Sequence, residues 1–449
     1  MALLSGGLFF HFVSVDLAGC SAVSGLGGLW FRRASYLAPN FTAAVGAPLS
    51  YLPLRTSIGA NMALCVFPSI LAVLAMAAVT SGHAAGRAKY LVYIGTYTNH
   101  GSQGIYTSEF DPSNGHLSAP KLAAETAQPS FLAVDPNRRF LYAINELDQF
   151  NGQPTGGVSA FSIEPTTGKL DLLNQVSSRG AGPAFIALDQ SGRYVLVANY
   201  TQGSVAVFRL SPDGSIGEST AFVRHQGSSV NPERQEGPHA HAILMSRDNR
   251  FAIVADLGLD ELLVYPFDAS RGTLGQPCTI RTDPGAGPRH LAFVASGQIV
   301  YVTNEMSSTI TAYSFHPSDG AMVPIQTISL LPSKFAGTST AAEVVLHPSS
   351  KYLYGSNRGD DSIAVFSVHP GLGTLTLIER VPTGGKTPRS FAIDPSGEWL
   401  LAANQDSNSV VTFRINRGSG RLTPTGQSIE VNSPAMVDFV EFLPLGGGK

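Results

Sequence analysis

The chain repeats itself about every 51 residues, and this repeat constrains its fold more than any other feature. One unit contains residues 182–188, a polar turn, residues 193–199, a short loop, residues 203–209 and a final apolar segment after the turn at 211–214. These runs are β-branched and aromatic, with Gly, Pro, Asp and Asn between them and no helical period. Each unit therefore predicts four short strands, as in a propeller blade. Equivalent units start at Pro129, Pro183, Pro238, Pro288, Ala341, Pro388 and Pro434.

A glycine followed two positions later by Leu, Ile or Met counts the units independently. It occurs at Gly115, Gly168, Gly214, Gly272, Gly320, Gly373 and Gly420. The first unit, from Tyr90, has no innermost strand of its own, and residues 435–442 form an innermost strand with no unit after it. Pairing the two closes a ring and removes an open sheet edge. We therefore predict an all-β, seven-bladed β-propeller. Two stacked β-sandwiches would not explain why the first unit lacks an innermost strand while one such strand is left over at the C-terminal end of the repeats.

Composition excludes several classes of partner and site. Charged residues make up only 14% of the 449 residues and the net charge is −3, so the sequence shows no basic face for nucleic acid. Cys20 and Cys65 lie near the N-terminus and Cys278 stands alone, which leaves no disulfide framework or cysteine-based zinc site in the repeats.

The N-terminal part predicts export. Residues 63–80 are almost wholly apolar, and 81–85 are small apart from His83, as in a secretory signal peptide with its cleavage zone. We expect a leader at 1–61 that is not translated, a start near Met62 or just upstream so that Arg55 is included, a signal peptide at 62–85 and the propeller at 86–449. This predicts a periplasmic or secreted protein with no membrane span after cleavage. The alternatives are an uncleaved anchor or a plain apolar leader on a cytoplasmic protein.

Polar residues gather at one predicted mouth of the channel. The first strand of a blade lines the axis, and its start lies on the same face as the loop between the second and third strands. His239 and His241 share one strand face in this scheme. The starts at Ser130, Phe131, Ala184 and Phe185 are small or apolar, so the mouth has a polar and an apolar half, as ligand pockets do. The polar half consists of His239, His241, Arg289, His290, Glu305, Glu343, Arg358 and Arg389.

Several of these residues have structural alternatives. The Asn that recurs at the end of the second strand is expected to make strand-end hydrogen bonds. His241 and His290 either bind substrate or hold the channel together, and Glu343 and Arg389 either bind substrate or pair with each other. His239, His241 and Glu343 are suitable metal ligands, but no spacing requires a metal, so we predict neither metal nor cofactor. Loops 146–156 and 221–237 are expected to open on this face.

The polar residues at the mouth offer a base, an acid and several guanidiniums for catalysis. No Gly-x-Ser-x-Gly elbow occurs and no cysteine lies near a histidine, which argues against covalent acyl chemistry. Arginine binds carboxylate or phosphate, and His or Glu moves protons. Beside an arginine placed at a developing oxyanion, these groups suit an acyl-oxygen reaction of a small anionic substrate.

A set of motifs resembles the lactonase seven-bladed propeller family, which includes bacterial propeller-type 6-phosphogluconolactonases and fungal carboxy-muconate lactonising enzymes. The resemblance extends from about Tyr90 to Phe442 and implies a metal-free site with His239, Arg289 and Glu305 at the proposed catalytic positions. Residues 301–304 also resemble the broader YVTN propeller repeats. The motifs are 236–241, 287–290, 304–305, 342–343, 356–359 and 387–389.

The leading hypothesis is hydrolysis of a sugar (aldonic) lactone, similar to the 6-phosphogluconolactonase reaction. Glu305 or His239 would activate water, Arg289 would stabilise the oxyanion, and Arg358 or Arg389 would hold the anionic group, with His241, His290 and Glu343 also binding substrate. For an exported chain we expect a lactone other than the cytosolic phosphosugar. The alternatives are a carboxy-muconate-type cycloisomerase and a non-enzymatic binding propeller.

Overall fold

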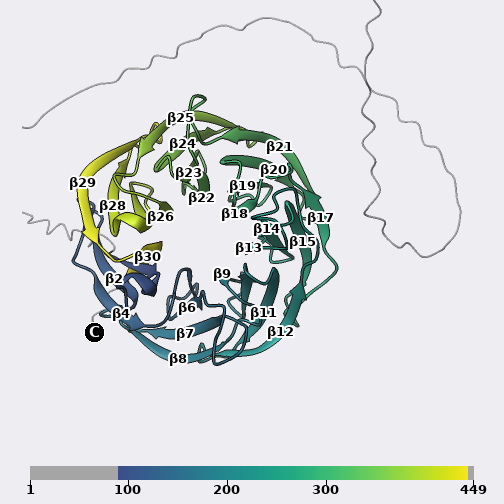
Figure 1. Ribbon diagram of the computed structural model, residues 1–449. Helices are drawn as coiled ribbons and strands as arrows, with labels where there is room; N and C mark the ends of the chain where they lie inside the picture. Colours follow the sequence, from purple (N-terminus) through teal and green to yellow (C-terminus); the bar gives the residue numbers. More distant parts are fainter. Residues whose placement is uncertain (1–88, 443–449) are drawn as a thin grey trace, which may run out of the picture. The chain divides into compact units, whose positions relative to one another are not determined.

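Each repeat folds into one antiparallel sheet, and the seven sheets form a ring around a central channel (Figure 1). The computed structural model describes residues 89–442. The predicted seven-bladed β-propeller is confirmed, and the stacked-sandwich alternative is excluded. The signal peptide and the leader, predicted at 62–85 and 1–61, lie outside the described residues. Within residues 89–442, no helix is long and apolar enough to cross a bilayer.

The strands of the first four blades are numbered in chain order, except that the last strand of the chain is the innermost strand of blade 1. Blade 1 contains β30 (Pro434–Phe442), β1 (Lys89–Thr96), β2 (Gly104–Asp111), β3 (His116–Leu117) and β4 (Lys121–Glu125). Blade 2 contains β5 (Leu132–Val134), β6 (Phe140–Asn145), β7 (Gly157–Ile163) and β8 (Leu170–Ser177). Blade 3 contains β9 (Pro183–Leu188), β10 (Tyr194–Asn199), β11 (Ser204–Leu210) and β12 (Ile216–Arg224). Blade 4 contains β13 (Ala240–Met245), β14 (Phe251–Asp256), β15 (Glu261–Asp268), β16 (Thr273–Leu274) and β17 (Cys278–Arg281).

The remaining three blades follow the same order from the channel outward. Blade 5 contains β18 (Pro288–Phe293), β19 (Ile299–Asn304), β20 (Thr309–Phe315) and β21 (Met322–Ser329). Blade 6 contains β22 (Thr340–Leu346), β23 (Tyr352–Arg358), β24 (Ser362–Val368) and β25 (Leu375–Pro382). Blade 7 contains β26 (Pro388–Ile393), β27 (Trp399–Asn404), β28 (Ser409–Ile415) and β29 (Leu422–Glu430). The second-to-third-strand loops of blades 1 and 7 contain single 3-10 turns, η1 (Thr98–His100) and η2 (Gln405–Ser407), which the apolar pattern did not predict.

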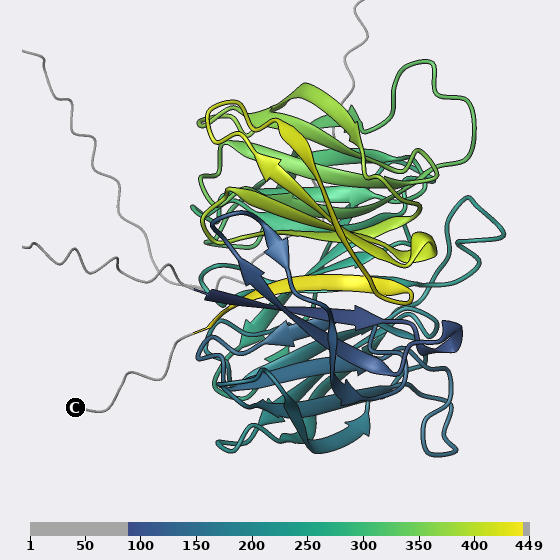
Figure 2. The same ribbon diagram turned by 90° about the vertical axis from the view of Figure 1, so that its left-hand side faces the viewer.

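The ring closes as predicted, because β30 pairs antiparallel with β1 (Figure 2). Val437 on β30 is buried in a cluster with Tyr90 and Phe110 of blade 1 and Trp399 of blade 7. The Trp399 ring packs edge-on against Phe110, and its Nε1 donates a hydrogen bond to the Pro112 carbonyl at 3.0 Å. The first and last blades are therefore joined by main-chain pairing and by a shared apolar core.

The repeated glycine has a physical reason. It lies in the turn before the fourth strand, with positive φ, and packs against the neighbouring blade. A Cβ on Gly115 would lie 2.3 Å from the Trp399 ring, so no larger residue fits there. Tyrosine hydroxyls of adjacent blades also reach these turns, as when Tyr93 donates to the Gly168 carbonyl at 2.8 Å. The glycines thus mark the contacts between blades, which is why they count the blades correctly.

Candidate active site

The longer loops lie on one face of the ring, opposite the face where β1 begins and β30 ends (Figure 2). This loop-bearing face is the mouth of the channel. The innermost strands enter the channel here, and two successive residues of each form two layers. The upper layer is Ser130, Ala184, His241, Arg289, Ala342, Arg389 and Ala435. The lower layer is Phe131, Phe185, Ala242, His290, Glu343, Ser390 and Met436.

The strand register corrects the position of the two histidines. The first paired residue of blade 4 is Ala240, opposite Asp256, and His241 is bulged out of the pairing. His241 is therefore the residue equivalent to Arg289 and Arg389, whereas His239 lies before the strand on the approach loop. The prediction that the repeat of blade 4 begins at Pro238 was wrong by two residues. The bulge itself is common to the blades, since it follows Pro183, Pro388 and Pro434 as it follows Ala240. Here the approach loop extends through His239, whose backbone N–H is held by Asp256.

Glu305 is the centre of the site. It follows β19 and its carboxylate contacts three guanidiniums: Arg234 Nη2 at 2.8 Å, Arg358 Nη2 at 2.9 Å and Arg289 Nε at 3.1 Å. Its side chain is only 6% exposed. Burial alone would raise the pKa of Glu305, but the positive charges of Arg358 and Arg289 outweigh it and lower the pKa to about 2. Glu305 is consequently a permanent carboxylate that holds arginines from three parts of the chain together.

Arg289 and Arg358 are fixed by further hydrogen bonds. Arg289 is 2% exposed and donates from Nη1 to the Ala342 carbonyl at 2.8 Å, while Arg358 donates to the Ala341 carbonyl at 3.2 Å. Burial, together with repulsion from Arg358 and Arg389, lowers the pKa of Arg289 to about 9. These arginines repel one another, so a bound anion would reduce the electrostatic repulsion between them.

Arg389 presents an open cation to the mouth. Its guanidinium lies over the Tyr97 ring, 5.2 Å from the centroid, and it makes no hydrogen bond or ion pair with residues 89–442. Pairing between Glu343 and Arg389, which the sequence left open, does not occur, because Glu343 binds His290 instead. The Tyr97 hydroxyl donates to Glu146 at 2.7 Å. Arg389 is therefore supported by an aromatic face while its donors stay available.

His239 lies at the rim with its ring stacked on Tyr200, at 4.5 Å between centroids. Its Nδ1 is 3.0 Å from the Tyr200 carbonyl, so Nδ1 carries a hydrogen and donates it. Its Nε2 is 3.3 Å from the exposed Glu236 carboxylate. The Tyr200 hydroxyl accepts from Arg234 at 3.3 Å, which links the rim histidine to the guanidinium cluster.

Asp256 takes the place of the recurrent Asn in the His239 blade and positions this loop. Its Oδ1 accepts from the backbone N–H of His239 at 2.8 Å, and its Oδ2 is 2.5 Å from His225 Nδ1. The predicted structural role of the recurrent Asn agrees with the contacts: Asn145 and Asn199, for example, donate to backbone carbonyls at 2.6 and 3.1 Å. His225, from the predicted covering loop, is buried against Asp256 and does not reach the mouth.

His241 and His290 lie deeper in the channel, with rings in edge-to-face contact at 5.2 Å. The Nε2 of His241 is 3.9 Å from Glu305, and burial followed by the charge of Arg289 lowers the pKa of His241 well below its ordinary value. The Nδ1 of His290 is 2.9 Å from Glu343. Burial and Arg289 lower the pKa of His290 to about 4, although Glu343 acts in the opposite direction. Both imidazoles are therefore neutral near pH 7.

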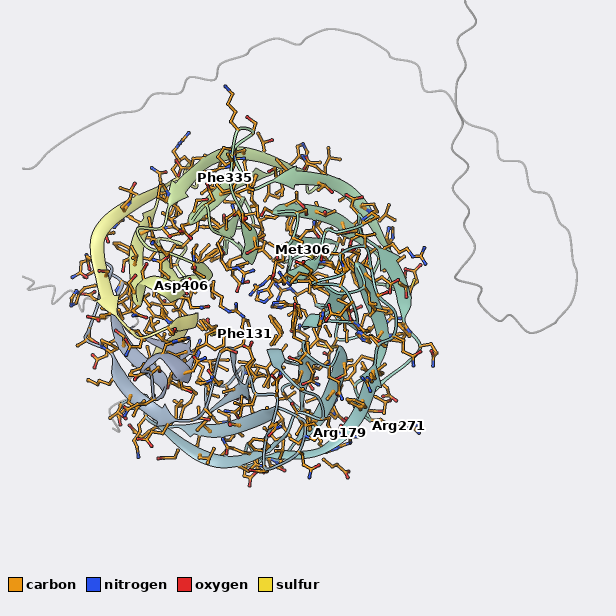
Figure 3. The ribbon with its side chains drawn as sticks, in the orientation of Figure 1. Phe131, Arg179, Arg271, Met306, Phe335 and Asp406 are labelled. Atoms are coloured by element: carbon orange, nitrogen blue, oxygen red, sulfur yellow. The ribbon has the colours of Figure 1, made fainter. Side chains whose placement is uncertain are left out.

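The apolar half of the channel is formed by Phe131 and Phe185, whose rings stack at 4.3 Å and meet the edge of His290. Phe131 lies beside the channel in Figure 3. The predicted division of the mouth into polar and apolar halves is thus present. Between the two layers the channel encloses a small axial cavity of about 10 Å³.

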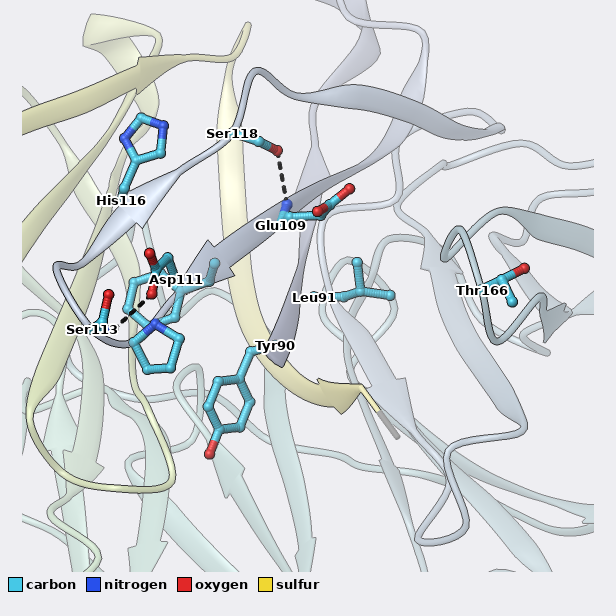
Figure 4. Close-up of a pocket in the computed structure, with 10 residues that line it drawn as sticks. Tyr90, Leu91, Glu109, Asp111, Ser113, His116, Ser118 and Thr166 are labelled. Carbon is cyan, nitrogen blue, oxygen red and sulfur yellow. Dashed lines mark hydrogen bonds between the residues drawn. The ribbon is translucent and has the colours of Figure 1, made fainter. Parts of the chain in front are cut away.

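A larger cavity of about 480 Å³ lies away from this site. Tyr90, Glu109, Asp111 and His116 line it, at the strand ends and turns of blade 1 on the face opposite the mouth (Figure 4). It contains none of the predicted site residues. Among residues 89–442, no group of three His, Cys, Asp or Glu side chains is arranged to hold a metal ion.

The eight predicted site residues all lie at the mouth or in the channel just below it, together with four residues that were given no site role from the sequence. Tyr97, Glu146 and Tyr200 each directly follow a second strand, at the position that Glu305 occupies in its own blade. This shared position, directly after a second strand, is the sequence signal that could have assigned them to the site. Arg234 comes from the covering loop, and nothing in its local sequence indicated that it would reach Glu305.

Comparison with known proteins gives one family. A model of the family described as "Lactonase, 7-bladed beta-propeller" matches residues 91–439. The 6-phosphogluconolactonase of Bacillus subtilis is 37% identical over 295 residues, which is 66% of this chain and 82% of the relative.

Solved structures agree with this comparison. The periplasmic gluconolactonase PpgL of Pseudomonas aeruginosa has a TM-score of 0.75 and 35% identity, over 79% of this chain and 100% of PpgL. A putative 6-phosphogluconolactonase of Bacteroides fragilis has a TM-score of 0.73 and 32% identity, over 80% of this chain and 99% of that protein.

Proposed function

The chain belongs to the lactonase seven-bladed β-propeller family, and we propose that it is a lactonase that hydrolyses a small anionic sugar (aldonic) lactone at the mouth of its channel. The observation that carries this proposal is the cluster of guanidiniums there. Three guanidiniums share the single Glu305 carboxylate, and Arg389 has no anionic partner among residues 89–442. Guanidiniums bind carboxylate and phosphate oxygens with two parallel hydrogen bonds.

Each residue then has a role in the proposed reaction. Arg389 and Arg358 bind the anionic group of the substrate, and Arg289 donates to the oxyanion that develops when water attacks the lactone carbonyl. Glu305 stays ionised and aligns the arginines. Three guanidiniums occupy its carboxylate and lower its pKa, so we assign the proton transfer to another residue.

His239 is the proton-transfer group at the rim. Its Nδ1 donates to the Tyr200 carbonyl, which leaves Nε2 to exchange a proton with the substrate. The Glu236 carboxylate lies 3.3 Å from this nitrogen. His241 lies directly below, where it contacts the ligand or the Glu305 cluster.

The substrate class follows from charge and location together. The Bacillus subtilis relative is named for a phosphorylated lactone, and the Pseudomonas aeruginosa neighbour is named a periplasmic gluconolactonase. With a signal peptide at 62–85 and translation from near Met62, this chain works outside the cytoplasm on an aldonic lactone whose anionic group is not restricted to phosphate. N-terminal sequencing of the mature protein checks the export step, and a terminus at Met1 contradicts it.

A pH-stat assay against a panel of lactones tests the proposed function. The wild type should release acid well above the spontaneous rate, and His239→Ala and Arg289→Ala should each lower kcat/KM by about 10²–10⁴. A cycloisomerase would instead convert a carboxylated alkene without consuming water. A binding propeller would turn over nothing, and in that case Arg289→Ala would change affinity only.

A further inference from the structure

Glu343 and His290 form a buried acid–base pair that the reaction outlined above does not use. Glu343 Oε1 is 2.9 Å from His290 Nδ1 and accepts from the Val344 backbone N–H at 3.0 Å, and its Oε2 accepts from the Ser390 hydroxyl at 3.4 Å. Burial opposes it, but the interaction with His290 and the charge of Arg289 keep the pKa of Glu343 below its ordinary value. The pair is therefore a fixed carboxylate and an imidazole whose orientation it sets.

One ring nitrogen of His290 is buried without a hydrogen-bond partner among the described residues. His290 is 3% exposed, and its Nε2 has no hydrogen-bond partner among residues 89–442. Because Nδ1 donates its hydrogen to Glu343, the neutral ring carries its lone pair on Nε2. A buried acceptor without a partner is unfavourable, so we expect a water or a substrate oxygen to donate a hydrogen bond to this nitrogen.

A small axial cavity lies beside this pair. His290 and Glu343 line it, with Ser390 beside them and with Ser130, Arg289 and Arg389 from the upper layer. Its volume of about 10 Å³ is close to what one water needs. A water there lies directly beneath the guanidiniums that bind the substrate, one residue further along the strands.

We propose that the Glu343–His290 pair is the general base of this enzyme and that it activates a water in the axial cavity for attack on the lactone carbonyl. This assignment rests on the proposed function. His290 is a catalytic residue in this scheme, because Nε2 takes a proton from the reacting water. Glu343 is a positioning residue, because it fixes the tautomer and stabilises the imidazolium that forms.

The step balances as a hydrolysis. The water oxygen bonds to the carbonyl carbon while one of its protons moves to His290 Nε2, and the carbonyl electron pair moves onto the oxygen that Arg289 contacts. When the carbonyl reforms, the bond to the ring oxygen breaks, and that oxygen takes a proton from His239 Nε2. His290 then returns its proton to solvent and His239 regains one. One water is consumed and no atom is oxidised or reduced.

The charges around His290 couple this base to substrate binding. The groups that face it are Arg289 on its own strand, His241 on β13, Glu343 on β22 and Arg389 on β26. The two arginines oppose protonation of His290, and Glu343 favours it. An anionic substrate on Arg389 offsets one of the opposing charges, so binding makes His290 a stronger base when it is needed.

Replacement of His290 tests the proposal in the full-length enzyme. His290→Gln should lower kcat by about 10²–10⁴ while the affinity for the aldonate product, measured by calorimetry, stays within about threefold. The matched control is His347→Gln, which removes another buried histidine, on the opposite face, whose nitrogens contact Ser349 and the Gly397 carbonyl. His347→Gln should keep the wild-type kcat.

A pH–rate profile separates catalysis from packing. In the wild type, log kcat should fall as the pH drops through the pKa of His290, and His290→Gln should lose this acid limb. Glu343→Gln should fold, bind product and still lower kcat by at least about tenfold, since an amide can hold the wrong tautomer. If His290→Gln matches His347→Gln in kcat and keeps the acid limb, the proposal is wrong. If the wild type opens no lactone, the proposed function fails first and this assignment falls with it.

Discussion

At the scale of single residues, one carboxylate determines the charge of the mouth. Glu305 is buried, contacts three arginines and remains ionised because their charges outweigh its burial. Its folded pKa lies below its unfolded value, so its contribution to stability is complete above about pH 4.5 and is lost as the pH falls toward 2. The size of this contribution is on the order of 3 kcal/mol.

Glu305→Gln should therefore be destabilised by about 3–5 kcal/mol at pH 7, because it leaves buried guanidiniums without their counter-charge. The difference from the wild type should shrink as the pH falls from 4.5 to 2. Denaturant unfolding at several pH values measures both effects.

Glu398→Gln is the matched control for this experiment. Glu398 also pairs with two arginines, Arg414 and Arg417, but its side chain is 25% exposed. Glu398→Gln should lower the free energy of unfolding by no more than about 1 kcal/mol. If both variants lost the same free energy of unfolding, the Glu305 cluster would stabilise the fold no more than a surface ion-pair network does.

The site residues on strands could be predicted from the sequence because the repeat fixes where each strand points. Arg289, Glu305 and Arg358 occupy positions that the blade geometry brings to one mouth, and their contacts confirm this. Arg234 could not be predicted, since its approach to Glu305 depends on the path of a loop. The pairing of Glu343 with His290 rather than Arg389 depends on side-chain distances across the channel, which the repeat does not set.

At the scale of elements, the closing strand β30 joins the two ends of the described chain. Lys89 is opposite Phe442 in the register with β1, so the two ends are adjacent across the sheet. Met436 and Val437 of β30 are 7% and 2% exposed. Each buried side chain of this kind contributes roughly 1.5–3 kcal/mol.

A circular permutant checks this closure. A chain that begins at Pro434, continues from Phe442 through a short Gly-Ser linker into Lys89 and ends at Asn432 makes blade 1 continuous, like the other six. It should fold, with an unchanged far-ultraviolet circular dichroism spectrum and kcat within about tenfold, because every strand pair of the ring and the shared core of blades 1 and 7 are kept.

The contrasting chain covers residues 89–432 and lacks β30. It exposes the edge of β1 and part of the core, and it should aggregate or unfold. A shortened chain as stable as the permutant would show that the closing strand is dispensable.

Element boundaries were the part of the fold that sequence reasoning placed least well. The strand β13 begins at Ala240 rather than near Pro238, because the approach loop extends through His239, whose backbone N–H binds Asp256. The number of blades and the closure were predictable, because the turn glycines and the missing innermost strand record contacts between repeats.

At the scale of the whole molecule, the ring makes the site possible. No single blade carries it: Arg234 and His239 come from the loop before blade 4, Arg289 and Glu305 from blade 5, Arg358 from blade 6 and Arg389 from blade 7. The apolar side chains of blades 2 and 3 complete the other half of the mouth. Seven similar repeats thus form an asymmetric pocket through different residues at equivalent positions.

Comparing the rates on an anionic and on a neutral lactone tests whether this pocket hydrolyses an anionic lactone. The comparison measures kcat/KM in a pH-stat for an anionic aldonolactone and for a neutral lactone with the same ring. The wild type should favour the anionic substrate by at least about tenfold, and Arg389→Met should lose most of that preference while the rate on the neutral lactone changes little. Acid release at no more than the spontaneous rate from both lactones would contradict the account.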